Sequence, residues 1–109
     1  MTQKEVIALA STVRPNALPE ELLARFLAEL EGRVESEIHT QAGRKKAPLV
    51  HTKNPRFSVP APFDRLYWTY LVAMIDLTVG DMDSYKLSYE LFNDAYSAYA
   101  RYYQRTGGR

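Results

Sequence analysis

Two pairs of side chains spaced four residues apart are candidates for acid–base or metal chemistry. Glu35 and His39 form the first pair, and Glu90 and Asp94 form the second. Side chains four apart share one face of an α-helix, so either pair could transfer a proton or bind a cation. A di-metal bundle needs a carboxylate and a histidine three apart from each of two helices, plus two further carboxylates. The sequence lacks that set, and we interpret both pairs as solvated charge.

Other catalytic patterns are weak as well. His51 has no partner within local reach, and the sequence contains no glycine-rich phosphate loop, no nucleophile elbow and no cysteine. An enzyme would need a pocket that gathers carboxylates or histidines from different helices. We therefore expect no enzymatic activity, no metal and no cofactor.

The positive charge of the chain is concentrated in its middle. The net charge is only +1, yet residues 38 to 63 hold five basic side chains and no acidic one. The same segment contains Gly43 and four prolines, so it cannot form one helix. We call residues 42–61 the basic loop. Its candidate contacts with a partner or with DNA are Arg44, Lys45, Lys46, Lys53 and Arg56.

Three interpretations of the basic loop stay open. Its cations could neutralise phosphates while Phe57 stacks on a base, as in single-strand binders. The loop could instead be a solvated segment that keeps a small domain soluble. It could also become ordered against an acidic protein surface when the domain assembles.

Apolar residues recur at helical spacing on both sides of the basic loop. They predict one all-α domain over residues 1–109, a small bundle of four helices at approximately 3–13, 19–41, 62–79 and 82–104. Thr2 and Glu5 fit a capping box, Pro19 suits a first helical turn, and Gly80 suits a left-handed C-terminal cap. The short connection after Gly80 predicts that the third and fourth helices form an antiparallel hairpin.

Three details of these helices are less regular. Beyond Leu30 only every fourth residue of the second predicted helix is apolar, so its end is expected to protrude from the bundle. Pro60 and Pro62 are expected to hold the chain extended before the third helix. Asp76 lies in the last turn of that helix, where the dipole disfavours a carboxylate. We expect a specific partner for Asp76, such as a tyrosine hydroxyl or an arginine.

The fourth predicted helix has two apolar rows. An aromatic stripe consists of Tyr85, Tyr89, Phe92, Tyr96, Tyr99 and Tyr103. A second row, well round the helix, consists of Leu87, Leu91, Ala98 and Tyr102. One packing partner does not need both rows. Either the first predicted helix covers the second row, or its residues are a subunit interface, since aromatic-rich surfaces are typical of interfaces.

Residues 59 to 107 contain a series of spaced aromatic residues and turns. The series consists of Val59 to Asp64, Tyr67, Tyr70-Leu71, Ile75-Asp76, Gly80-Asp81, Tyr85, Phe92-Asn93, Ala95-Tyr96, Tyr102-Tyr103 and Arg105-Thr106. It resembles a family of small structural proteins of tailed bacteriophages and prophages, the head–tail connector or adaptor proteins of the phage neck. EVIALA in the first helix, followed by Pro15-Asn16, agrees more weakly.

The resemblance implies a virion structural protein that joins a ring of copies at the portal vertex. Its partners would be further copies, the portal and tail-side neck proteins, with packaged DNA as a candidate contact of the basic loop. The chain would occupy the virion neck, and the host cytoplasm before assembly. The alternative is a small phage nucleic-acid-binding or regulatory helical domain. No membrane contact is expected, because the longest uncharged apolar run, Leu66–Ile75, is about half of the roughly 20 residues that a span needs.

Overall fold

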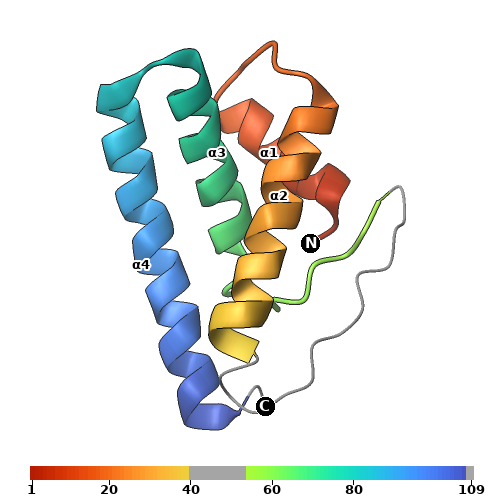
Figure 1. Ribbon diagram of the computed structural model, residues 1–109, viewed down its shortest axis with the longest axis vertical. Helices are drawn as coiled ribbons and strands as arrows, with labels where there is room; N and C mark the ends of the chain where they lie inside the picture. Colours follow the sequence, from red (N-terminus) through yellow and green to blue (C-terminus); the bar gives the residue numbers. More distant parts are fainter. Residues whose placement is uncertain (40–53, 108–109) are drawn as a thin grey trace.

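The computed structural model describes residues 1–39 and 54–107 of the chain. Its helices, in chain order, are α1 (Gln3–Val13), α2 (Glu20–Val34), the π-helical turn η1 (Glu35–His39), α3 (Arg65–Val79) and α4 (Met82–Thr106). Figure 1 shows α4 beside α3, with α2 on the other side of α3. No strand occurs in the described residues, and the predicted all-α bundle of four helices is confirmed.

The start of α1 has the predicted capping box. The Thr2 hydroxyl accepts a hydrogen bond from the Glu5 backbone N–H at 3.3 Å, and the Glu5 carboxylate accepts one from the Thr2 N–H at 2.9 Å. These two bonds satisfy donors that have no partner inside the helix. They also lower the pKa of Glu5. The helix has the predicted bounds, residues 3 to 13.

The second helix differs from its prediction at both ends. Pro19 is the N-cap, with extended backbone angles, so the first helical residue is Glu20. The α-helix stops at Val34 and continues as η1, in which the turns are wider. Val34 and Ile38 are buried, so the expectation that this end protrudes is wrong. This end of the helix packs against α4, which covers its apolar residues. Residues 40 and 41 lie outside the described residues.

The third helix starts later than predicted. Residues 61–64 form a turn in which Phe63 N–H donates to the Pro60 carbonyl at 3.0 Å, and the Ala61–Pro62 peptide bond is cis. The α-helix begins only at Arg65, and the expectation of an extended chain through Pro62 is wrong for this turn. At the other end Gly80 has φ 83°, the left-handed conformation predicted for it.

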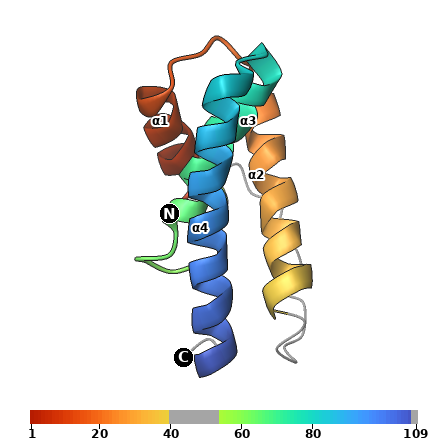
Figure 2. The same cartoon turned by 90° about the vertical axis from the view of Figure 1, so that its left-hand side faces the viewer.

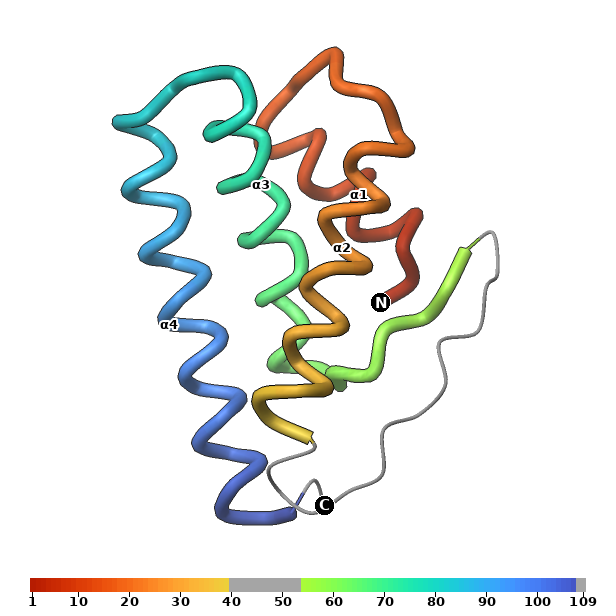
Figure 3. Tube along the Cα trace, in the orientation of Figure 1, coloured from red at the N-terminus to blue at the C-terminus, as the bar shows by residue number. Residues whose placement is uncertain are grey.

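A short turn after Gly80 reverses the chain into α4. The Asp81 carboxylate accepts a hydrogen bond from the Ser84 N–H at 3.2 Å and caps the new helix. The α3–α4 hairpin is the most extensive helix pair in the fold. Figure 3 follows this antiparallel path, with the α3–α4 connection at the opposite end of the hairpin from the end of α4. α4 extends two residues beyond its predicted end.

The core takes residues from all four helices. α1 packs on α3 and α2 but makes no contact with α4. In Figure 2 the two lie on different sides of α3. The interpretation that the first helix covers the second row of α4 is therefore wrong. Of the aromatic stripe, Phe92, Tyr99 and Tyr103 are fully buried.

Candidate functional site

The structure describes residues 54–61 of the basic loop. Arg44, Lys45, Lys46 and Lys53 lie outside the described residues. Arg56 is described and exposed, and it forms an isolated backbone bridge with Thr2. The structure therefore fixes one of the five predicted cations of this loop, next to the start of α1.

The end of the basic loop is anchored by a buried carboxylate on α2. Glu31 is 9% exposed. Its Oε2 accepts a hydrogen bond from the Ser58 N–H at 2.7 Å, and its Oε1 accepts from the Ser58 hydroxyl at 3.1 Å and the Tyr67 hydroxyl at 2.8 Å. The Tyr67 oxygen in turn accepts from the Val59 N–H at 3.1 Å. This network fixes residues 58 and 59 between α2 and α3.

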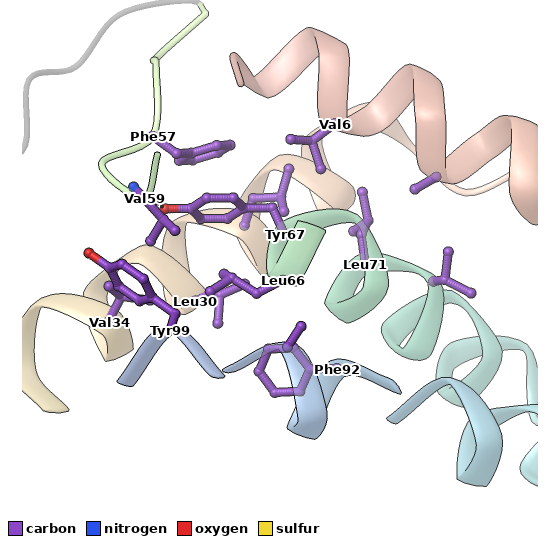
Figure 4. Packing of buried hydrophobic residues seen from close by; sticks show 14 of the residues in the cluster. Val6, Leu30, Val34, Phe57, Val59, Leu66, Tyr67, Leu71, Phe92 and Tyr99 are labelled. Atoms are coloured by element: carbon purple, nitrogen blue, oxygen red, sulfur yellow. Dashed lines mark hydrogen bonds between the residues drawn. The ribbon is translucent and has the colours of Figure 1, made fainter. Parts of the chain in front are cut away.

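Phe57 completes the anchor. Its ring stacks on the Tyr67 ring with centroids 4.5 Å apart and is 8% exposed (Figure 4). The interpretation that Phe57 stacks on a nucleic-acid base is therefore wrong, because its ring is already covered inside the protein. Burial, the nearby Glu31 carboxylate and the hydrogen bond to it raise the pKa of Tyr67.

Glu35 and His39 lie next to a tyrosine of α4. His39 Nδ1 lies 2.6 Å from Glu35 Oε1, and its Nε2 lies 2.8 Å from the Tyr99 hydroxyl. The Glu35 and His39 side chains are only 13% and 10% exposed, so the interpretation of this pair as solvated charge is wrong. Glu90 and Asp94, by contrast, are both exposed.

Glu35, His39 and Tyr99 form a continuous chain of hydrogen bonds. The role of each ring nitrogen depends on the His39 tautomer: with the hydrogen on Nδ1, that nitrogen donates to Glu35 and Nε2 accepts from the phenol. Tyr99 is 2% exposed, and burial raises its pKa, so the phenol keeps its proton at neutral pH. The arrangement is a hydrogen-bonded connection between η1 and α4.

A second connection between the same elements is exposed. Arg33 Nε and the Tyr96 hydroxyl both donate to Glu37 Oε1, at 2.9 Å and 2.6 Å, and the Arg33 guanidinium lies 4.7 Å from the Tyr96 ring centre. These two hydrogen bonds lower the pKa of Glu37. Together the two connections explain why the end of α2 and η1 lies against α4.

The Asp76 carboxylate has the arginine partner that its position requires. Asp76 is fully buried, and Arg14 Nε lies 2.8 Å from its Oδ1 as an ion pair that is not aligned as a hydrogen bond. Arg14 Nη2 donates to Oδ2 at 3.4 Å, and the Ser88 hydroxyl donates to Oδ2 at 2.9 Å. Asp76 therefore joins the end of α1, the end of α3 and the start of α4.

The predicted interface row is divided between two environments. Leu87 and Leu91 are 68% and 57% exposed, while Ala98 and Tyr102 are partly buried. The Tyr102 ring stacks on Phe63 with centroids 4.6 Å apart. Beside this stack lies an open hollow of about 470 Å³, lined by Phe63, Ala98, Arg101, Gln104 and Arg105. The outward side of α4 thus carries two exposed leucines near one end and a basic hollow near the other.

Among residues 1–39 and 54–107, no group of three or more histidine, aspartate or glutamate side chains could hold a metal ion. None of the helices described is long and apolar enough to cross a membrane. No protein-family model, curated protein or solved structure matches the chain.

Sequence reasoning missed the Glu31 anchor, although a signal for it exists. Glu31 follows Leu27 by four residues and precedes Val34 by three, so it falls on the apolar face of α2. A carboxylate at a core-facing position needs hydrogen-bond donors. Tyr67 likewise places a polar group, its hydroxyl, at a core-facing position of α3. Ser58 lies 27 positions from Glu31, Tyr67 lies 36 positions from it, and Val59 is bound through Tyr67, so spacing cannot find them.

Proposed function

We propose that the chain is a non-enzymatic structural subunit in the neck of a tailed bacteriophage. As a head–tail connector or adaptor it would join other copies in a ring at the portal vertex, and contact the portal and tail-side neck proteins. The resemblance of residues 59 to 107 to head–tail connector proteins supports this class of protein. A subunit of this kind works by binding its neighbours, so it needs contact surfaces and no active site.

The observation that carries this proposal is the exposed leucine pair on α4. Leu87 and Leu91 are the two most exposed large apolar side chains on this helix, although the helix buries three aromatic side chains elsewhere. Apolar surface left over after the core is filled marks contact with another molecule. Ala98 and Tyr102 continue the row toward the basic hollow and extend the candidate subunit interface.

The experiment uses the phage or prophage that encodes the chain. Replacement of Arg44, Lys45 and Lys46 by alanine should leave circular dichroism and thermal unfolding of the purified chain unchanged. In the phage, the same variant should yield heads and tails that are not joined, counted by negative-stain electron microscopy. Antibody labelling of wild-type virions should place the chain at the neck, and the host cytoplasm should hold it before assembly.

Two results would overturn the proposal. One is normal numbers of joined particles together with absence of the chain from purified virions. The other is binding of the purified chain to generic DNA that weakens with salt and is lost in the triple variant. The second result would favour the alternative, a small phage nucleic-acid-binding or regulatory helical domain.

A further inference from the structure

The outward side of α4 carries a stripe with the same spacing as the buried aromatic stripe. Its members are four, three, four, three and four residues apart, and we call them the outer stripe: Leu87, Leu91, Asp94, Ala98, Arg101 and Arg105. This spacing is that of the seam of a coiled coil. Five of the six side chains are exposed and Ala98 is partly buried. In Figure 2 the outward side of α4 faces the viewer, and no other labelled helix lies in front of it.

The charges along the outer stripe are arranged in order. Asp94 lies at the middle of α4 and the neighbouring Glu90 lies nearer its start, while Arg101 and Arg105 lie toward its end. Two parallel copies of this helix would place like charges opposite one another, which is repulsive. Two antiparallel copies would place the carboxylates of each copy near the arginines of the other. The charge order thus selects one orientation for pairing.

The hollow provides room for the leucines. Ala98 has the smallest side chain of the stripe, and Phe63 adds an apolar wall beside it. Arg101 and Arg105 line the same hollow, so an apolar side chain that enters it meets arginine stems, and acidic neighbours of that side chain meet the guanidinium groups. Leu91, with Glu90 and Asp94 beside it, has this combination of an apolar side chain and flanking carboxylates.

We propose that the free chain pairs with a second copy of itself through the outer stripe, with the two α4 helices antiparallel. Centred between Asp94 and Ala98, this register puts Leu87 opposite the second copy's Arg105 and Leu91 opposite its Arg101. Every contact then occurs twice, as a two-fold interface requires. The outer stripe runs from Leu87 to Arg105, so at about 1.5 Å per residue the seam is about 27 Å long.

This pairing does not rest on the proposed neck function. It concerns the purified chain, and a ring that uses Leu87 and Leu91 would have to open the pair. Failure of the pairing would leave the neck proposal untouched, because that proposal is tested in virions. Failure of the neck proposal would likewise leave the two-fold pair in place.

The first test is sedimentation equilibrium of the full chain. We expect a concentration-dependent dimer, and replacement of Leu87 and Leu91 by serine should lower the association constant at least tenfold. Lys86→Glu is the matched control, because Lys86 is an exposed residue of the same helix outside the stripe, and it should leave dimerisation within about twofold. A wild-type chain that stays monomeric at all concentrations overturns the proposal. Unchanged unfolding curves would show that the serine variant folds.

The second test exchanges charges. Arg101→Glu/Arg105→Glu and Glu90→Arg/Asp94→Arg should each be monomeric alone, since each then faces like charge in the antiparallel pair. An equimolar mixture of the two variants should form a heterodimer, because opposite charges meet again. A dimer that is insensitive to both changes, or a mixture that stays monomeric, overturns the antiparallel register.

The third test reads the orientation directly. The chain has no cysteine, so introduced thiols react only with each other. Leu91→Cys and Arg101→Cys chains, when mixed and oxidised, should form a mixed disulfide in large excess over either homodimer. Predominant homodimeric disulfides would show a parallel pair and would overturn the proposal.

Discussion

Asp76 lies in the last turn of α3, and Glu31 lies on α2 and binds Tyr67 near the start of α3. Both carboxylates are buried, but the protein stabilises them with different partners. Asp76 faces the cation Arg14 and the Ser88 hydroxyl. Glu31 faces the uncharged donors of Ser58 and Tyr67, and no ion pair involves it among the described residues. Because buried charge without a partner is costly, each site depends on the groups that approach it.

The two sites also differ in what they connect. The Asp76 partners lie on α4 and directly after α1, and these elements pack on α3 in any case. The Glu31 partners include Ser58 at the end of the basic loop, which is not itself part of a helix. Loss of the Asp76 pair should therefore lower the free energy of global unfolding, whereas loss of the Glu31 network should mainly release residues 57–59.

The largest expected effect is at the ion pair. Arg14→Met leaves the Asp76 carboxylate buried without its cation, and it should lower the free energy of unfolding by about 3 kcal/mol, the low end for a broken buried pair because Arg14 is 40% exposed. Urea unfolding followed by circular dichroism measures this. Arg25→Met is the control, since Arg25 forms an exposed pair with Glu29, and it should change stability by less than about 0.5 kcal/mol. Equal effects of both variants would contradict the comparison.

The next effect is at Glu31. Glu31→Ala removes the acceptor of three hydrogen bonds and should cost about 2 kcal/mol. Limited proteolysis should cut residues 54–59 faster in this variant, at denaturant concentrations where the helices are still folded. Glu29→Ala, an exposed neighbour on α2, should leave the cleavage rate unchanged. If Glu31→Ala unfolds only globally, the distinction between the two sites is wrong.

A third effect depends on pH, and Tyr67 at the Glu31 end contributes to it. Burial raises the pKa of Tyr67 above its ordinary value near 10. The stabilisation from the protonated phenol is therefore complete below pH 10 and is lost as the pH rises above 10. One such group changes stability by at most about 1.4 kcal/mol per pH unit. Tyr67→Phe should flatten this alkaline decline, measured as unfolding free energy between pH 8 and 11. Ser88→Ala, at the Asp76 end, should retain the wild-type slope.

The smallest effect should come from single hydroxyls. Ser88→Ala removes the 2.9 Å hydrogen bond to buried Asp76 and should cost about 1 kcal/mol. Ser58→Ala removes a 3.1 Å bond at an exposed residue while the Ser58 N–H bond to Glu31 remains, so it should cost less. Thermal unfolding of the two variants, measured side by side, shows which substitution lowers the stability more. A larger loss at Ser58 would mean that Glu31 depends on the loop more than on Tyr67.

Local signals were the most reliable in the sequence. The bounds of α1 and the left-handed Gly80 follow from short-range rules that need no distant contact. The start of α3 was placed three residues too early, because a proline followed by apolar residues fits both a helix and the turn that is found at residues 61–64. The expected protrusion of the end of α2 was wrong, because its sparse apolar residues are buried and polar contacts of Glu37 and His39 with α4 add to this packing.

The candidate site was less predictable than the helices. A carboxylate in the last turn of α3 predicted a partner for Asp76, but nothing in the spacing identified Arg14, 62 residues away. Glu35 and His39 were found by spacing and assigned to solvent, because their burial depends on Tyr99 of another helix. Phe57 was assigned to an exposed role for the same reason, since the Tyr67 ring that covers it is not visible from local sequence.

The sequence by itself determined the helices of this protein, their caps and the two equally spaced stripes of α4, because these depend on residues within a few positions of one another. Only the tertiary structure decided which stripe is buried. α3 and η1 pack against the aromatic stripe, while α1 packs on the far side of α3 and leaves the outer stripe exposed. Spacing defines a face of a helix, but burial of that face depends on where the other helices go.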